Sequence, residues 1–285
     1  MSDDRATHEV ADFPVPQRML DTLDGLAAGT LAPIEPRDAA SVVLLREPDG
    51  PGSTEALLML RQRSMSFAAG VVAFAGGSVD PSDSAVALRL SEPDATEWER
   101  ALRIERREIV AVLSAAVRET FEETGVLLAT HSGQPIDATT PDWRERRRAL
   151  EAHELGWDTL VRDRGLELQT DRLRLWSCWI TPVGELKRFR TWFFLVNVGS
   201  DQPVEIESTE AFRSAWITPS AALEAFARQE IQLLPPQQSI LRDLAEALSD
   251  TSLADVQSAP HIPTRVEPVV RRGPDGAYLE IVSSS

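Results

Sequence analysis

The fold of this chain is decided by one stretch, Arg118-Glu-Thr-Phe-Glu-Glu-Thr-Gly-Val126. Its carboxylates at Glu119, Glu122 and Glu123 stand at positions i, i+3 and i+4, so a helix places all three on one face. Like charges at this spacing weaken an isolated helix, so a compensating group is expected. A divalent cation such as Mg²⁺ or Mn²⁺ can fill that role, because both ions take hard oxygen ligands. The competing interpretation is a solvated acidic face on which Arg118 forms local ion pairs.

The stretch lies in the second half of a predicted helix. Apolar residues recur at helical spacing over about 102–128, and Gly125 is expected to end the helix. Apolar runs predict strands at 41–45, 56–61, 71–74, 173–180, 191–198 and about 215–217. Two further helices are predicted at 221–229 and 235–248. This order predicts an α/β (α+β) fold, in which helices pack on a mixed sheet.

The acidic stretch resembles the second half of the Nudix box, Gly-x5-Glu-x7-Arg-Glu-U-x-Glu-Glu-x-Gly-U, where U is a bulky aliphatic residue. The constant positions are filled in register by Arg118, Glu119, Glu122, Glu123, Gly125 and Val126. Thr120 stands where an aliphatic residue is usual. The first half resembles Gly76-Gly77 followed by Asp83 at the glutamate position. Because 34 residues rather than 7 separate Asp83 from Arg118, the box carries an insertion of about 27 residues.

Such an insertion resembles the long-insertion branch of the Nudix hydrolases, that of the peroxisomal CoA and acyl-CoA diphosphatases. Further elements agree in the same order: Arg61-x-Arg-Ser-x-x-Phe-x-x-Gly-x-x-x-Phe-x-Gly-Gly77, Trp179-Ile-Thr-Pro182, Arg188-Phe-x-Thr-x-Phe-Phe194, Trp216-x-x-Pro219 and Leu234-Pro-Pro-Gln237. The resemblance covers roughly residues 40–245. It implies an α/β/α sandwich enlarged by helical insertions.

The resemblance also implies a function, that of a metal-dependent hydrolase cleaving the diphosphate of a nucleoside diphosphate derivative. CoA or acyl-CoA is the first choice of substrate. A nucleotide sugar or a dinucleotide is the alternative, because Ser66 and Ala75 replace the arginine and proline of the CoA signature. A non-catalytic Nudix-fold module that binds a ligand or regulates is the alternative of another class. The complete set of glutamates argues against that module.

Site residues follow from the same resemblance. Glu119, Glu122, Glu123 and the Gly77 carbonyl are the expected ligands of Mg²⁺ or Mn²⁺. The expected catalytic residues are Glu119 as general base, Arg118 as the group that orients the glutamates, and Glu122. The base could instead lie on a later loop, where the candidates are Glu185, Glu207 and Glu210.

Four arginines are candidates for binding the substrate's phosphates or anionic end. Arg61 and Arg63 directly precede the box, and Arg188 and Arg190 flank Phe189. A guanidinium suits this role because it can donate two parallel hydrogen bonds to a phosphate. The competing interpretation is charge at an exposed strand end. The tryptophans at 176, 179 and 192 are expected in the core.

Composition limits the partners. The chain has 285 residues and a net charge of −16, which argues against polynucleotides and anionic membranes and favours a small diphosphate held through a cation. No apolar run approaches the ~20 residues of a membrane span, and no signal segment is recognised at the N-terminus. With its single Cys178, the chain is expected to be cytoplasmic. Its single lysine among many arginines suggests a bacterial source. A homodimer is left open.

The expected organisation is one enlarged domain. Residues 1–36 form an N-terminal arm, and 37–250 form the Nudix domain with insertions at about 84–107 and 130–168. Residues 251–285 form a C-terminal extension, read as a β-hairpin from the runs at 265–270 and 277–282 around Gly273-Pro-Asp-Gly276.

Overall fold

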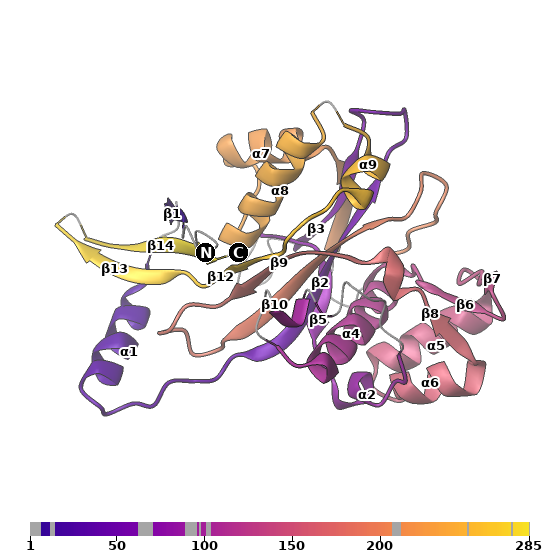
Figure 1. Cartoon of the computed structure of the whole chain (residues 1–285), viewed down its shortest axis with the longest axis horizontal. Helices are drawn as coiled ribbons and strands as arrows, with labels where there is room; N and C mark the ends of the chain where they lie inside the picture. The colour runs from indigo at the N-terminus through magenta and orange to yellow at the C-terminus, as the bar shows by residue number, and fades with distance from the viewer. Residues whose placement is uncertain are drawn as a thin grey trace.

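A mixed β-sheet runs through the computed structural model, with helices on both of its faces (Figure 1). The structure describes residues 7–11, 15–61, 71–88, 96, 98–100, 104–206, 212–249, 251–274 and 276–284. On one side of the sheet lies α4 (Arg106–Thr124). On the other lie α7 (Pro219–Ala227), α8 (Pro235–Ala247) and α9 (Leu253–Ser258). The predicted mixed sheet with packed helices is confirmed.

Within the described residues the sheet has eleven strands, and its main path is β1-β14-β12-β9-β10-β2-β3-β11. The strands are β1 (Thr7–Ala11), β2 (Arg37–Arg46), β3 (Glu55–Arg61), β4 (Val72–Ala73), β5 (Ala75–Ser78), β9 (Arg174–Ile180), β10 (Phe189–Asn197), β11 (Phe212–Ile217), β12 (Thr264–Val266), β13 (Val269–Gly273) and β14 (Gly276–Ser284). β2 pairs in parallel with β10 and antiparallel with β5. β2 therefore links the strand that carries Gly76 and Gly77 to the centre of the sheet.

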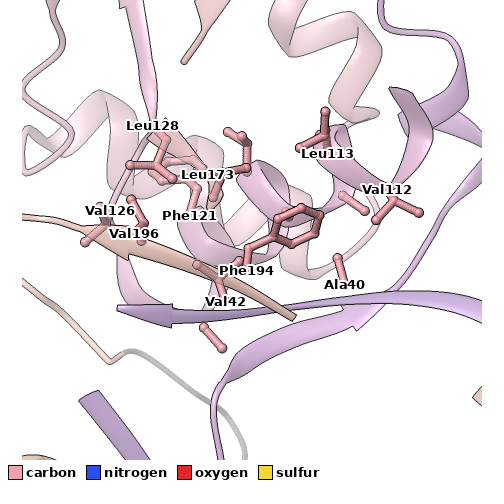
Figure 2. Packing of buried hydrophobic residues seen from close by; sticks show 14 of the residues in the cluster. Ala40, Val42, Val112, Leu113, Phe121, Val126, Leu128, Leu173, Phe194 and Val196 are labelled. Atoms are coloured by element: carbon pink, nitrogen blue, oxygen red, sulfur yellow. The ribbon is translucent and has the colours of Figure 1, made fainter. Parts of the chain in front are cut away.

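Two apolar cores sandwich β2, because its side chains alternate between faces. Val42 and Leu44 join the cluster that packs under α4, whereas Val43 and Leu45 join the cluster under α8. Figure 2 shows the first cluster, in which Val42 from β2 and Phe194 from β10 lie near Phe121 of α4. The continuous apolar run of β2 is what burial on both faces requires.

The helix α4 has clear end signals. At its start, Glu105 and Glu108 form a reciprocal capping box. At its end, Gly125 adopts the left-handed conformation, φ 72°, which a glycine reaches without a steric penalty. The buried Thr120 hydroxyl donates to the Ala116 carbonyl, 2.7 Å away, so the polar residue at an aliphatic position is satisfied within the helix.

Small elements surround α4. The region expected as the second insertion contains α5 (Pro141–Glu151), α6 (Trp157–Arg164) and a three-stranded sheet of β6 (Ala129–His131), β7 (Gln134–Pro135) and β8 (Leu166–Leu168). The short helix α2 (Pro81–Ser84) directly precedes the first expected insertion, and the 3₁₀ turn η1 (Thr170–Arg172) follows the second. The buried Trp157 packs in the same cluster as α4 and donates its Nε1–H to Ser114 Oγ at 3.0 Å. Residues 130–168 are thus docked on the helix that carries the glutamates. The division into domain and insertions stays a prediction.

Segments near the two ends of the chain form strands at one edge of the sheet. In the predicted arm, α1 (Gln17–Ala27) is a helix whose Met19 is buried against Gly184. A strand that the sequence did not predict, β1, pairs antiparallel with β14. Among the described residues, no helix is long and apolar enough to span a bilayer.

Two predicted strands differ from the structure in their extent. The run at 265–270 forms the predicted hairpin but is interrupted: β12 and β13 both pair antiparallel with β14 in one register, and β12 also pairs in parallel with β9. Pro268 lies between them and lacks an N–H to continue the ladder. The strand predicted at 71–74 is present as the short β4, which pairs with β3, whereas β5 begins at Ala75, beyond the predicted run, and pairs with β2.

Candidate metal and active site

The two halves of the acidic motif meet through one buried guanidinium. Arg118 on α4 donates from Nε and Nη2 to the two carboxylate oxygens of Asp83, at 3.0 and 2.9 Å, and from Nη2 to the Ser78 carbonyl at 2.9 Å. The Asp83 side chain is fully buried on α2, where it also accepts from the Asp80 N–H at 2.8 Å. The bidentate pair therefore closes the motif across the 34 intervening residues.

The same arginine also contacts two of the glutamates. Its Nη1 donates to Glu119 Oε1 at 2.8 Å and to Glu122 Oε2 at 3.2 Å. Both glutamate side chains are only 12% exposed. Their spacing of three residues on α4 places both beside the guanidinium, as the sequence pattern predicts.

Burial has the largest effect on the pKa values of the three carboxylates that contact Arg118. It raises the pKa of Glu119, and it raises the pKa of Glu122 to about 7, although Arg118 opposes both shifts. Burial also raises the pKa of Asp83 above its usual value. For Arg118, burial lowers the pKa, but the neighbouring carboxylates outweigh it and raise the pKa above the ordinary value. One guanidinium thus serves three buried or nearly buried carboxylates, which leaves an excess of negative charge when all are ionised.

The double glycine of β5 packs directly against the glutamates. The Gly76 N–H donates to Glu123 Oε2 at 2.7 Å. A Cβ on Gly77 would stand 2.5 Å from Glu119 Oε1, and a Cβ on Gly76 would stand 2.3 Å from the Ala40 carbonyl oxygen. Glycine is required at position 76 by the close approach of the β2 backbone, whereas a side chain at position 77 would displace the Glu119 carboxylate.

The chemistry of this donor set fits a hard divalent cation. Carboxylate and carbonyl oxygens are the ligands of Mg²⁺ and Mn²⁺, and a second positive charge would offset the excess of buried negative charge. In the part of the chain that the structure describes, no three His, Cys, Asp or Glu side chains are gathered as a ready metal cage. Glu119 and Glu122 are turned toward Arg118, and Glu123 toward the Gly76 N–H. Holding a metal therefore requires these side chains to turn.

Two of the predicted substrate arginines are engaged with protein groups. Arg188 is buried and donates to the carbonyls of Thr181 and Ile34, at 2.9 and 2.8 Å, and to Glu267 at 3.0 Å. Its role in substrate binding stays a prediction.

Arg190 binds both carboxylate oxygens of Asp38, at 2.6 and 2.8 Å, and Glu108 Oε1 at 2.6 Å. Glu108 is three helical turns before Glu119, about 16 Å along α4. The structure therefore places Arg190 at the other end of the helix from the glutamates. Its role in substrate binding also stays a prediction.

The structure describes only some of the remaining predicted site residues. Glu185 lies on the turn between β9 and β10, where its carboxylate pairs with Arg18 of α1 at 3.4 Å. The Arg61 side chain, and the whole of Arg63, Glu207 and Glu210, lie outside the described residues.

Sequence reasoning missed Arg147 of α5, which donates from Nε to the main-chain carbonyl of Glu122 at 2.7 Å. The spacing of Arg144 and Arg147 indicates that they share a helix face. A main-chain acceptor on a different helix leaves no sequence pattern to find.

Comparisons with known proteins identify the family of the chain. A family model for the NUDT19 Nudix domain matches residues 92–244. The human acyl-coenzyme A diphosphatase NUDT19 is 36% identical over 159 residues, which cover 50% of this chain and 42% of that protein. The chicken (Gallus gallus) acyl-coenzyme A diphosphatase NUDT19 is 34% identical over 171 residues, covering 50% and 45%. The chain thus spans less than half the length of these curated relatives.

A solved structure supports the fold. The crystal structure of a NUDIX hydrolase from Alicyclobacillus acidocaldarius aligns with a TM-score of 0.63 and 24% identity, over 80% of this chain and 98% of the other. At that identity the likeness concerns the fold alone. It confirms the predicted sandwich with a mixed sheet.

Proposed function

The chain belongs to the Nudix hydrolases, in the family of the NUDT19 Nudix domain, and we propose that it hydrolyses the diphosphate of CoA or an acyl-CoA with Mg²⁺ or Mn²⁺. The observation that carries the proposal is the glutamate cluster of α4: Arg118 binds Glu119 and Glu122, while Glu119 and Glu123 lie against the Gly76-Gly77 backbone. The family is typically dependent on a divalent metal. The finer assignment, to particular residues and to this substrate, is the proposal.

The proposed metal ligands are the carboxylates of Glu119, Glu122 and Glu123 and the carbonyl of Gly77. When bound, the cation screens the charge of the diphosphate and lowers the pKa of the attacking water. Arg118 keeps the glutamates in place, because its five donors can bind Asp83 and the glutamates at once. Asp83 in turn fixes the guanidinium, since it is fully buried and bound to it bidentately.

Glu119 is the preferred general base. It is close to the β5 backbone, and burial raises its pKa, which makes the carboxylate a better proton acceptor near neutral pH. Glu185, Glu207 and Glu210 remain the alternatives. Of these, Glu185 would first have to leave its ion pair with Arg18.

The choice of CoA or acyl-CoA rests on the named relatives, of which the chain covers less than half. A nucleotide sugar or a dinucleotide is the second candidate, favoured by Ser66 and Ala75 at two positions of the CoA signature. Both candidates share the same reaction, in which water attacks one phosphorus and the bridging oxygen leaves with the other phosphate.

The test is incubation of the purified chain in H₂¹⁸O with Mg²⁺ or Mn²⁺ and a panel of CoA, acyl-CoA, nucleotide sugars and dinucleotides. The expected products are two phosphate monoesters, one of which carries a single ¹⁸O by mass. Glu122→Gln is expected to lower kcat by about 100-fold or more. Removal of the metal with EDTA is expected to lower kcat by at least as much. The matched control, Glu145→Gln on the exposed face of α5, is expected to leave kcat unchanged.

Undiminished turnover by a folded Glu122→Gln variant would remove the metal-site assignment. Cleavage of nucleotide sugars or dinucleotides but not of CoA species would select the second candidate. Tight binding of one compound without any cleavage would favour a non-catalytic module.

A further inference from the structure

The buried Arg147 connects three segments around the end of α4. Its side chain, on α5, is 1% exposed. Nε donates to the Glu122 carbonyl at 2.7 Å, Nη1 donates to the Glu205 carbonyl at 2.7 Å, and the Glu151 carboxylate lies 3.5 Å from Nε. The guanidinium therefore joins α5, the last turn of α4 and the chain that follows β10.

The Glu122 carbonyl needs this donor because it lies in the last turn of α4. The carbonyls at the end of a helix lack the N–H group four residues later. For Glu122 that group would be the Val126 N–H, which instead donates to Thr124 Oγ1 at 3.3 Å. Arg147 supplies the missing donor, and its positive charge is favourable at the negative end of the helix dipole.

The turn after α4 is shaped around the same side chain. A Cβ on Gly125 would stand 3.1 Å from Arg147 Nη1, which is tighter than an ordinary contact. Glycine at this position thus serves both the left-handed turn and the approach of the guanidinium.

The segment at 204–206 is held against α4 by the same set of contacts. The Glu205 N–H donates to the Thr124 carbonyl at 2.9 Å, and the Glu205 carboxylate is bound by Arg144, one helical turn before Arg147, with Nε–Oε2 at 2.9 Å. The segment at 204–206 is therefore bound to both α4 and α5.

We propose that Arg147 is a positioning residue of the metal site, which fixes the main chain of Glu122 and so the direction in which its carboxylate points. The inference rests on the proposed function, in which Glu122 is a metal ligand. Groups that orient metal ligands from behind typically contribute 10–100-fold to metal affinity or activity. A lysine cannot replace the guanidinium fully, because one ammonium lacks the planar fork that reaches two carbonyls.

The experiment compares Arg147→Met and Arg147→Lys with wild type and with Arg146→Met. Arg146 is the matched control, because it lies on α5 and binds only Asp142 among the described residues, at the exposed side. Mn²⁺ is titrated calorimetrically into each full-length protein, and amide hydrogen exchange is measured at Glu205. The expected result is a Kd for Mn²⁺ about 10-fold higher in Arg147→Met, a smaller increase in Arg147→Lys, and less than a twofold change in Arg146→Met.

Kinetic and hydrogen-exchange measurements distinguish a positioning role of Arg147 from a purely stabilising one. We expect kcat to fall in Arg147→Met at saturating Mn²⁺ with the substrate KM unchanged, and the Glu205 amide to exchange faster. If Arg147→Met does not fold, Arg147→Lys decides by the same measurements. A Kd within twofold of wild type in a folded Arg147 variant, or an equal loss in Arg146→Met, would overturn the inference and leave the proposed function intact. A wild-type protein that binds no Mn²⁺ would overturn both.

Discussion

The two halves of α4 are stabilised in opposite ways. In the first half, Glu105 and Glu108 cap the helix, Glu108 pairs with Arg190, and apolar side chains such as Ile109 and Val112 pack on the sheet. In the second half, three glutamates share one face, where Arg118 binds Glu119 and Glu122 and the Gly76 N–H donates to Glu123. The second half accumulates negative charge that a bound cation would offset, and this difference supports the proposed metal site there.

The largest effect is expected from Arg118→Met. It leaves Asp83, which is fully buried, without its bidentate partner, and removing one partner of a buried ion pair destabilises a protein by about 3–5 kcal/mol. Urea unfolding measures the loss. In the first half, Arg107→Met removes only the exposed pair with Glu105 and is expected to cost less than about 0.5 kcal/mol. Similar losses in the two variants would contradict the contrast between the halves.

The next effect is a pH dependence that arises from Glu122 in the second half. In the metal-free protein the pKa of Glu122 is raised to about 7 by burial, against 4.5 when unfolded, so folding favours the protonated form. Its contribution to stability is complete below pH 4.5 and is lost as the pH rises to about 7, by roughly 1–3 kcal/mol. Urea unfolding in EDTA at pH 5 and pH 7.5 should show this loss in wild type. The loss of stability should be smaller in Glu122→Gln. Adding Mg²⁺ should restore the stability of wild type at pH 7.5 but not change that of Glu122→Gln.

A smaller effect is expected at the first half from Arg190→Met. This change leaves Asp38 and Glu108 without their shared guanidinium, but both carboxylates are about a quarter exposed and water can solvate them. We expect a loss of about 1–2 kcal/mol in the free energy of unfolding, with the Kd for Mn²⁺ unchanged. Mn²⁺ binding weakened as much as in Glu122→Gln would show that the two halves are not independent.

The sequence alone predicts what is local. The apolar run of β2, the helical spacing of α4 and the end signal at Gly125 each follow from neighbours in the chain, and each agrees with the structure. The match of the motif also pairs Asp83 with Arg118 in register, although the bidentate contact depends on how 34 residues fold.

The rest depends on tertiary contacts that leave no local pattern. An arginine such as Arg147 could donate to the end of any helix, so its bond to the Glu122 carbonyl has no signal in the sequence. The sequence around Arg188 fits an exposed strand end equally well, whereas its side chain binds two carbonyls and Glu267. The split between β12 and β13 at Pro268 can be predicted from the sequence, since proline interrupts a ladder. The pairing of β12 with β9 cannot be predicted in this way, because register between distant strands is set by the packed sheet.

A small loss of stability is expected from Gly77→Ala, the variant that separates folding from function most sharply. The new Cβ would meet the Glu119 carboxylate, 2.5 Å away, which is the free end of a side chain and can turn aside. The free energy of unfolding should therefore change by less than about 1 kcal/mol. The displaced carboxylate should weaken Mn²⁺ binding and turnover by about 10-fold or more. Gly76→Ala is the contrasting variant, because its Cβ would meet the Ala40 backbone at 2.3 Å, which cannot turn aside. Its main effect should be on unfolding, and a Gly77→Ala protein with unaltered Mn²⁺ affinity would show that the Glu119 carboxylate does not hold the metal.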